Sequence, residues 1–400
     1  MVFVMTTLIS FLGKGQDGRG YRDANYQFDD NQYFEKQKYI GLALAEKIKP
    51  SKIIFLGTSG SMWDVFLESE SEGLVEQWLE LNDAVKSQSV TQKQLQPFEQ
   101  FLSKALNTEV HCILIPFAKD AQEQIAILSV LANILHDKDQ VILDVTHGFR
   151  HLPMLALVAA RFLKTIKKID VQHIYYGALE MTEQYKTPVL KLDSLLSMLD
   201  WIDALTVFDK DGDYGQFSSL LAQEGLSEND ANLLNQATFF ERTTNSSNAR
   251  QKLNTVRDHL ETFDTPIYSL FKQQLLKRLH WVNRANRGLQ EQQLAKEYLE
   301  RKDYLRAVIF AMEGMISSAL FKDKLDENSR DNRDEKANNL AGNISFRKLK
   351  NLRNTLAHGN RSNDKDALDA VSDEKKMQQS LKDHFKKLLE NNRLITIDNN

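Results

Sequence analysis

The stretch QVILDVTHGFRHLPMLALVAARFLKTI, residues 140–166, contains the alternation that decides the fold of the first half of the chain. It begins with QVILDV, a short apolar run that is typical of a buried strand. The polar residues THGFR follow as an exit loop, and PMLALVAARFLKTI has apolar residues at helical spacing. The stretch therefore predicts a strand, a loop and a helix in that order.

The same alternation repeats along the chain from residue 6 to about residue 180. Strands are expected at 6–12, 52–57, 111–117, 140–148 with its exit loop, and 171–180, and helices at 39–48, within 62–106, at 121–135 and at 153–166. Near-continuous apolar strands that alternate with helices belong to parallel sheets covered on both faces. The sequence therefore predicts an α/β fold with a Rossmann-like parallel sheet, whose ligands would bind at the carboxyl ends of the strands.

Beyond residue 191 the strand pattern stops and the apolar residues recur at helical spacing. We therefore predict two domains, an α/β domain at 1–190 and an all-α region at 191–400. The run 323–339 has almost no apolar residues, so it is expected to be a surface loop or a partly disordered insert.

The composition limits where the protein works and what it binds. The chain has 400 residues and a net charge of −4, which argues against a nucleic-acid binder that uses its whole surface but permits a local basic site. Its longest strongly apolar run, 154–160, is too short to span a bilayer, and the apolar N-terminus is expected to be a buried strand rather than a signal peptide. A single cysteine, Cys112, suits a reducing compartment. We expect a cytoplasmic protein with no membrane partner.

Three strand exits share one kind of chemistry. They are GKG at 13–15, TSGS at 58–61 and DVTHGFR at 144–150, and in a parallel sheet they would open on the same rim. Their hydroxyls, glycine amides, lysine, histidine and arginine suit phosphates and sugar hydroxyls. The alternative is structural, because serine and threonine are good helix caps and a glycine can simply make a turn.

Two other patterns are weaker. GKGQDG, residues 13–18, matches a dinucleotide-binding pattern, but the chain after it is polar and aromatic rather than an amphipathic helix. DKDGDYG, residues 209–215, lacks the spacing of a calcium loop and is expected to be a turn between helices. The histidines lack cysteine or carboxylate partners at metal-ligand spacing, so no metal is expected.

The strand exits resemble those of CARF domains, the doubly wound sensor domains of CRISPR-associated effectors. The resemblance rests on FLGKG (11–15), FLGTSGS (55–61), DVTHGFRHLP (144–153) and IYYGALE (174–180). It implies that the rims of two protomers bind one cyclic oligoadenylate across an isologous dimer. The ligand contacts that it implies are Gly13, Lys14, Gly15, Thr58, Ser59, Gly60, Ser61, Thr146, His147, Gly148, Phe149 and Arg150, with Asn25 and Tyr26 closing over the ligand from the long loop after the first strand.

RNTLAHG, residues 353–359, lies near an expected helix end in the second half. Arg353 and His358 are five positions apart, so on an ideal helix they point about 140° apart and form a poor single-chain clamp. In a purely structural interpretation His358 favours the helix C-terminus and Gly359 is a left-handed cap. Arg353 would then belong to a basic face with Arg347, Lys348 and Lys350.

The pattern R-N-x-x-x-H resembles the motif of HEPN ribonucleases, and the segment 300–321 is similar to an upstream helix of that family. The resemblance implies metal-independent cleavage of single-stranded RNA at a site composed of two protomers, leaving a 2′,3′-cyclic phosphate. His358 would act on the 2′-hydroxyl or the leaving 5′-oxygen, and Arg353 would stabilise the phosphorane. Asn354 would fix the geometry of the motif, and Lys348, Lys350 and Arg361 would hold the RNA backbone.

Together these resemblances imply a homodimer or higher homo-oligomer with a CARF-like sensor followed by a HEPN-like ribonuclease, in type III CRISPR antiviral defence. Cyclic oligoadenylate, with cyclic tetra-adenylate as the expected ring, would be the allosteric activator, and no cofactor, metal or DNA would be needed. The alternative is a regulatory module whose sensor half binds or slowly cleaves the ligand through Lys14, Ser59 and His147, while its helical half only mediates oligomerisation.

Overall fold

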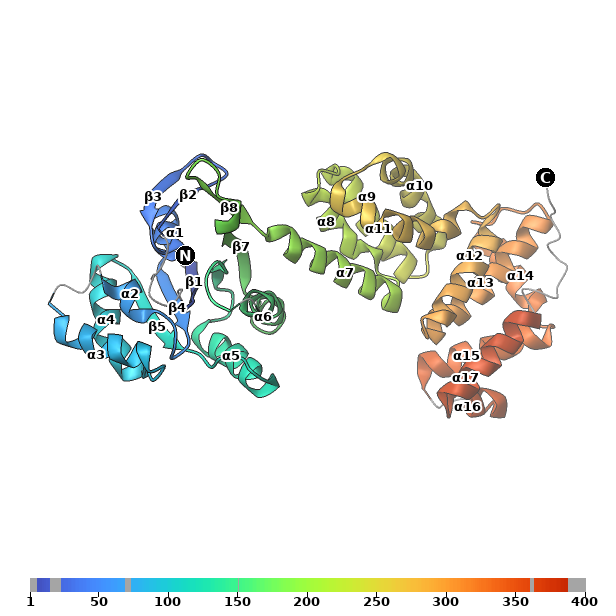
Figure 1. Ribbon diagram of the computed structural model, residues 1–400. Coiled ribbons are helices and arrows are strands. Elements are labelled where there is room, and N and C mark those ends of the chain that lie inside the picture. The colour runs from blue at the N-terminus through green and yellow to red at the C-terminus, as the bar shows by residue number, and fades with distance from the viewer. Residues whose placement is uncertain (1–5, 15–22, 69–72, 150, 360–362, 388–400) are drawn as a thin grey trace. The chain divides into compact units, whose positions relative to one another are not determined.

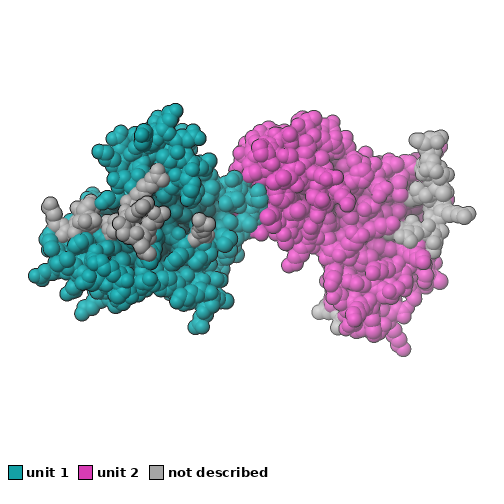
Figure 2. Space-filling model, in the orientation of Figure 1, with its two compact units in different colours: residues 1–199 teal, residues 200–400 magenta. Residues whose placement is uncertain are grey.

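The structure is a computed structural model, and it describes residues 6–14, 23–68, 73–149, 151–359 and 363–387 (Figure 1). The chain forms two compact units, residues 1–199 and 200–400 (Figure 2). The first unit is built on one sheet and the second is helical.

The first unit contains an eight-stranded sheet with the order β3-β2-β8-β7-β6-β1-β4-β5. The strands are β1 (Thr6–Leu12), β2 (Ala24–Gln27), β3 (Tyr33–Gln37), β4 (Lys52–Gly57), β5 (Glu109–Leu114), β6 (Gln140–Asp144), β7 (Asp170–Gly177) and β8 (Thr187–Lys191). The five strands expected from the sequence are present and run parallel to one another, as β5-β4-β1-β6-β7.

The prediction of a purely parallel sheet is wrong at one edge. There β8 pairs antiparallel with β7, β2 pairs parallel with β8, and β3 pairs antiparallel with β2. The strands β2 and β3 are short. Buried and half-buried positions alternate in β2 and no residue of β3 is buried, so both lack the continuous apolar run by which buried strands are recognised. The sheet is therefore mixed, with a parallel core.

Helices cover both faces of this sheet. They are α1 (Ile40–Ile48), α2 (Trp63–Glu68), α3 (Val75–Lys86), α4 (Gln92–Ala105), α5 (Ala121–Ile134) and α6 (Leu152–Lys167). Neighbouring strand residues point to opposite faces, so Leu8 packs in the core that also contains Trp63 and Leu95, whereas Ile9 packs in the core under α5 and α6. The β1 strand is thus buried on both sides.

Side chains of α4 occupy the outer edge of β5. The Gln92 amide accepts from the backbone nitrogen of Leu114 at 3.0 Å and donates to the carbonyl of Cys112 at 2.5 Å. The Glu99 carboxylate accepts from the backbone nitrogen of Cys112 at 2.7 Å. Ser103 accepts in the same way from Val110, at 3.0 Å. Four backbone groups on the outer edge of this strand are therefore hydrogen-bonded to side chains of a helix.

The second unit packs its helices around one apolar core that runs from Trp201 to Phe385. After α7 (Asp193–Asp211), which spans the boundary between the units, the helices are α8 (Phe217–Gln223), α9 (Glu228–Arg242), α10 (Ser246–Thr262), α11 (Pro266–Arg278), α12 (Arg287–Glu300), α13 (Tyr304–Lys322), α14 (Arg330–Leu340), α15 (Ile344–His358), α16 (Lys365–Val371) and α17 (Glu374–Phe385). Among the described helices, only α13 is long and apolar enough to cross a membrane, and 61% of that stretch is buried in the unit. It is placed as a core helix.

The expectation of a loop or disordered insert at 323–339 is confirmed for 323–329, which form turns and a loop, but it is wrong from residue 330 onward, where α14 forms. Ser329 caps its first turn, and none of its residues is buried. Arg333 donates to the Glu313 carboxylate of α13 and Lys336 donates to Asp323, while Ala337 and Leu340 pack against the apolar core. Two apolar residues near its end are too few to form the continuous apolar stripe by which a helix is recognised in a sequence.

Candidate functional site

The three polar strand exits of the first unit meet at one rim of the sheet. The strands β6, β1 and β4 are neighbours, and they run in the same direction. A Cβ atom built on Gly13 would lie 2.5 Å from the backbone nitrogen of Gly148, and Met62 donates its N–H to the Gly13 carbonyl at 3.0 Å. The expected convergence of these loops is confirmed.

Two hydroxyls of the loop after β4 are used within the protein. Ser61 Oγ accepts from the backbone nitrogen of Thr58 at 2.9 Å and donates to the carbonyl of Leu12 at 2.7 Å. Thr58 Oγ1 lies 3.3 Å from Ser61 Oγ, and both residues are buried. These two side chains hold the loop in place, while Ser59 is half-buried and Lys14 is exposed on the same rim.

A buried carboxylate anchors the loop after β6. Asp144 accepts a hydrogen bond from the Ser10 hydroxyl and a second from the backbone nitrogen of Thr146, at 2.9 Å. Thr146 Oγ1 in turn accepts from the backbone nitrogen of Gly177 at 2.8 Å. Burial raises the pKa of Asp144 to about 6, against hydrogen bonds that lower it. Thr146, a predicted ligand contact, is therefore tied into the sheet through its hydroxyl.

The rest of this loop carries aromatic rings. His147 stacks on Tyr39, with ring centroids 5.0 Å apart and planes at 19°. Burial lowers the pKa of His147 to about 4, so its imidazole is neutral at pH 7. Phe149 is exposed and stacks on His151 with centroids 5.7 Å apart, and Gly148 has a φ of +111° that favours glycine.

Of the remaining predicted ligand contacts, two lie in a strand, one is buried in the loop after β4, and two are outside the described residues. Asn25 and Tyr26 belong to β2, so the prediction that they lie in a loop is wrong. Tyr26 is fully buried, and the Asn25 amide accepts from the backbone nitrogen of Lys36 at 2.8 Å and donates to the carbonyl of Tyr185 at 3.0 Å. Gly60 is buried beside Gln88. Gly15 and Arg150 are outside the described residues.

In the second unit the RNTLAHG motif ends helix α15. Asn354 and His358 are exposed, whereas Arg353 is half-buried and lines a groove of about 620 Å³ between α13, α14 and α15. Its Nε atom is buried and has no hydrogen-bond partner within the described part of the chain. The arginine and the histidine thus lie in different surroundings, as their separation of about 140° around the helix predicts.

Gly359 terminates this helix, as the sequence indicates. Its φ of 69° is positive, but its ψ of −166° lies outside the left-handed helical region that we predicted for the cap. That combination is adopted essentially by glycine alone, so Gly359 fixes where the chain leaves His358.

The predicted RNA-backbone lysines differ in their partners. Lys348 forms an ion pair with Asp366 at 2.6 Å. Lys350 is exposed and lines the same groove as Arg353. Arg361 lies outside the described residues.

Sequence reasoning missed the contribution of α14. Its Arg330 and Arg333 line the groove beside Arg353, but the run that contains them was expected to be a loop. The available signals were the serine cap and the Arg330–Asp334 pair at helical spacing.

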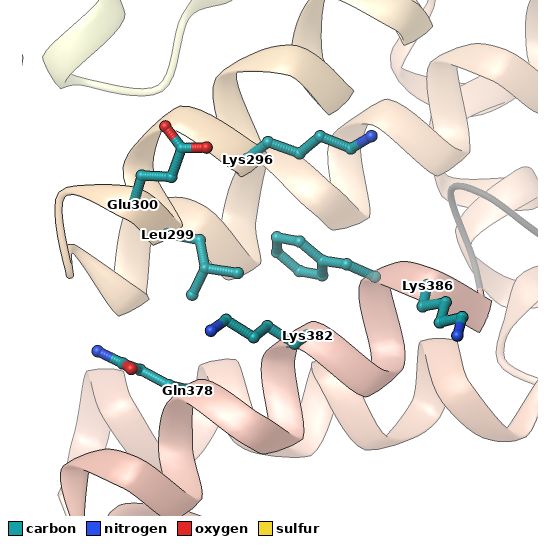
Figure 3. Close-up of a pocket in the computed structure, with 7 residues that line it drawn as sticks. Lys296, Leu299, Glu300, Gln378, Lys382 and Lys386 are labelled. Atoms are coloured by element: carbon teal, nitrogen blue, oxygen red, sulfur yellow. The ribbon is translucent and has the colours of Figure 1, made fainter.

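A second pocket of the helical unit contains none of the predicted residues (Figure 3). It measures about 460 Å³, and Lys296, Lys382 and Lys386 stand around it with Leu299 and Phe385. Among the described residues, no group of three or more histidine, cysteine, aspartate or glutamate side chains could hold a metal ion.

Comparisons with known proteins support a CARF-containing CRISPR effector. Residues 7–180 match the family model for the CARF domain of the CRISPR system endoribonuclease Csx1. The chain is also similar to CRISPR-associated protein MJ1674 of Methanocaldococcus jannaschii, with 26% identity over 246 residues. That alignment covers 55% of this chain, and the chain spans 39% of the length of that relative.

Proposed function

We propose that this protein is a cyclic oligoadenylate-activated endoribonuclease that cleaves single-stranded RNA in type III CRISPR antiviral defence. The observation that carries the proposal is the position of the RNTLAHG motif. In a chain whose residues 7–180 match a CARF domain, Arg353 lines a groove and His358 is exposed at the end of the same helix.

The proposed cleavage uses the 2′-hydroxyl of the RNA as the nucleophile, which is why DNA is spared. The 2′-oxygen attacks the adjacent phosphorus, the bond from phosphorus to the 5′-oxygen breaks, and a 2′,3′-cyclic phosphate remains. His358 of one copy accepts the 2′-hydroxyl proton, and His358 of a second copy protonates the leaving 5′-oxygen. Arg353 stabilises the charge of the phosphorane, Asn354 positions the motif, and the reaction needs no metal.

The proposed activator site is the rim where the exits of β1, β4 and β6 meet. Lys14 and Ser59 are accessible there, and His147 and Gly148 lie beside Gly13. The neutral imidazole of His147 would donate one hydrogen bond to a phosphate or a base. Cyclic tetra-adenylate, the expected ring, presents the phosphates and sugar hydroxyls that such a rim suits.

A second copy of the chain is the proposed partner of helix α6. Met154, Val158, Phe162 and Ile166 follow one another at four-residue intervals along it, and each has between 41% and 68% of its surface exposed. Such an apolar stripe is typical of an interaction surface. Because α6 starts directly after the loop that carries His147 and Gly148, a two-fold contact here would bring two rims together.

The cellular setting is also part of the proposal. The only cysteine, Cys112, is buried in β5, and burial raises the pKa of its thiol. A buried, protonated thiol is inert, which fits a protein that works in the reducing cytoplasm.

The proposal is tested by incubating the purified protein with single-stranded RNA and EDTA, with and without cyclic tetra- or hexa-adenylate. We expect cleavage that depends on the cyclic nucleotide, and products that end in a 2′,3′-cyclic phosphate. His358→Ala should abolish this cleavage without changing the circular dichroism spectrum. Equal cleavage with and without the cyclic nucleotide, or cleavage by the His358→Ala variant, would contradict the proposal.

A further inference from the structure

The groove that contains Arg353 has one apolar and one basic side. Ile309, Met312 and Ile316 of α13 line the apolar side. The basic side chains come from two other helices, with Arg330 and Arg333 on α14 and Lys350 and Arg353 on α15. A volume of about 620 Å³ lies in the range of pockets that hold small organic molecules.

The charges of the groove are unbalanced. Four basic side chains and two acidic ones, Glu313 and Asp334, line it, so two positive charges are in excess in a chain whose net charge is −4. Glu313 is bonded by Arg333. Asp334 is 3.7 Å from Arg330, and both side chains are largely exposed, so this ion pair is weak.

The two α15 cations carry most of the excess. Within the described part of the chain, neither Lys350 nor Arg353 forms an ion pair, and the buried Nε atom of Arg353 lacks an acceptor. A buried donor without an acceptor is costly, and a ligand oxygen would remove that cost. The groove therefore suits an anion that is joined to a flat apolar body.

A nucleotide has this composition, and the position of the groove indicates which nucleotide. Arg353 and His358 are five residues apart on α15, which is about 7.5 Å along the helix axis. We propose that the groove binds the nucleotide of the RNA strand that flanks the scissile phosphodiester. Lys350 and Arg330 hold its phosphate, and its base lies against Ile309 and Met312. Arg353 bonds the scissile phosphodiester beside it, which supplies the acceptor that its Nε atom lacks. This inference rests on the proposed function and makes α14 part of the substrate-binding surface.

The test uses the full-length protein with cyclic tetra-adenylate and a fluorescein-labelled 2′-fluoro oligouridylate, which has no 2′-hydroxyl and cannot be cleaved. Fluorescence anisotropy gives the affinity at several salt concentrations. We expect Lys350→Ala and Arg330→Ala each to weaken binding several-fold. Each should also reduce the slope of log affinity against log salt by about 0.7, the value for one lost phosphate contact on a single strand.

Two further variants separate binding from structure. Lys350→Arg should restore both the affinity and the slope, because it keeps the charge. Lys382→Ala removes an exposed lysine from the other pocket of the same unit, and it should leave both unchanged. With cleavable RNA, the loss in Lys350→Ala should fall on KM more than on kcat.

The outcomes distinguish the groove from the proposed function. If Lys350→Ala and Arg330→Ala leave the affinity and the slope unchanged while the protein still cleaves RNA, the proposal that the groove binds RNA is overturned. Equal losses in these variants and in Lys382→Ala would also overturn it, because general attraction would then explain the binding. Dissociation of the dimer by the groove variants would overturn it in favour of a second copy as the occupant. If the groove variants weaken RNA binding but no variant or wild-type protein cleaves RNA, RNA binding in the groove is supported and the proposed ribonuclease activity is rejected.

Discussion

Gly13 and Gly148 approach each other so closely that a Cβ atom on Gly13 would lie 2.5 Å from the backbone nitrogen of Gly148. A side chain at Gly13 must therefore push apart two of the three loops that form the rim. We predict that Gly13→Ala weakens binding of cyclic tetra-adenylate at least tenfold while the protein stays folded. Isothermal titration calorimetry measures the affinity, and circular dichroism checks the fold.

The matched variant for this prediction is Gly60→Ala in the same rim. A Cβ atom there would meet the Gln88 side chain at 3.2 Å, and a flexible side chain can move away. We expect a smaller loss of affinity than for Gly13→Ala. Equal losses would show that the contact between the loops of β1 and β6 does not control binding.

The low pKa of His147 gives a prediction about pH. A histidine with an ordinary pKa near 6.5 gains a positive charge between pH 8 and pH 6, and an anionic ligand would then bind more tightly. The pKa of His147 is lowered to about 4 by burial, so it stays neutral over this interval. We predict that His147 contributes no tightening between pH 8 and pH 6, so the wild type and His147→Asn should show the same pH dependence in calorimetry. Tightening on acidification that His147→Asn abolishes would refute this.

Asp144 predicts how stability depends on pH. Its pKa is about 6 in the folded protein, against an ordinary value of 3.8 for an exposed aspartate, so between these values the folded chain holds a proton that the unfolded chain has lost. Its contribution to the free energy of unfolding therefore falls as the pH rises from about 4 to about 6, by roughly 3 kcal/mol in all. We predict that Asp144→Asn removes this fall.

Urea unfolding between pH 4 and pH 7 measures the effect of Asp144→Asn. The relevant quantity is the change of stability with pH, because the substitution also alters the bonds to Ser10 and Thr146. Asp137→Asn, at an exposed position before β6, is the control and should keep the pH dependence of the wild type. If the stability of Asp144→Asn depends on pH as that of the wild type does, Asp144 is not the group that causes the fall.

Phe162→Glu on α6 tests the proposed contact with a second copy. Burying a large apolar side chain contributes about 1.5–3 kcal/mol, and a two-fold interface buries each side chain twice. The substitution should therefore weaken the dimer by about 100-fold or more, which analytical ultracentrifugation measures. Leu270→Glu, an exposed apolar position on α11, should leave the dimer intact. A Phe162→Glu protein that remains dimeric would exclude this face of α6.

The sequence predicts the centre of the sheet and its β5 edge, but not the opposite edge formed by β8, β2 and β3. The strands β1, β4 and β6 are buried, so their apolar runs and polar exits could be read directly. The strand β3 has no buried residue and β2 alternates, so neither carries that signal. Pairing at the sheet edge depends on partners distant in the sequence, such as Tyr26 with Thr187.

The candidate site could also be predicted only in part. The convergence of the glycine loops follows from parallel strands, but the inward bonds of Thr58 and Ser61 depend on Leu12, which is distant in the sequence. The place of Arg353 and His358 near a helix end follows from local patterning. The groove beside Arg353 could not be predicted from local patterning, because charged contacts such as that between Arg333 and Glu313 help to position α14.

The side chains of α4 along β5 also limit how copies of this protein can associate. Sheets with a free edge strand can take up a strand from another chain, which is a common route to aggregation. Here the outward backbone groups of Val110, Cys112 and Leu114 already bond Ser103, Glu99 and Gln92. Another copy therefore cannot extend the sheet beyond β5 without first displacing α4. The sheet is therefore protected at this edge from polymerising through its strands.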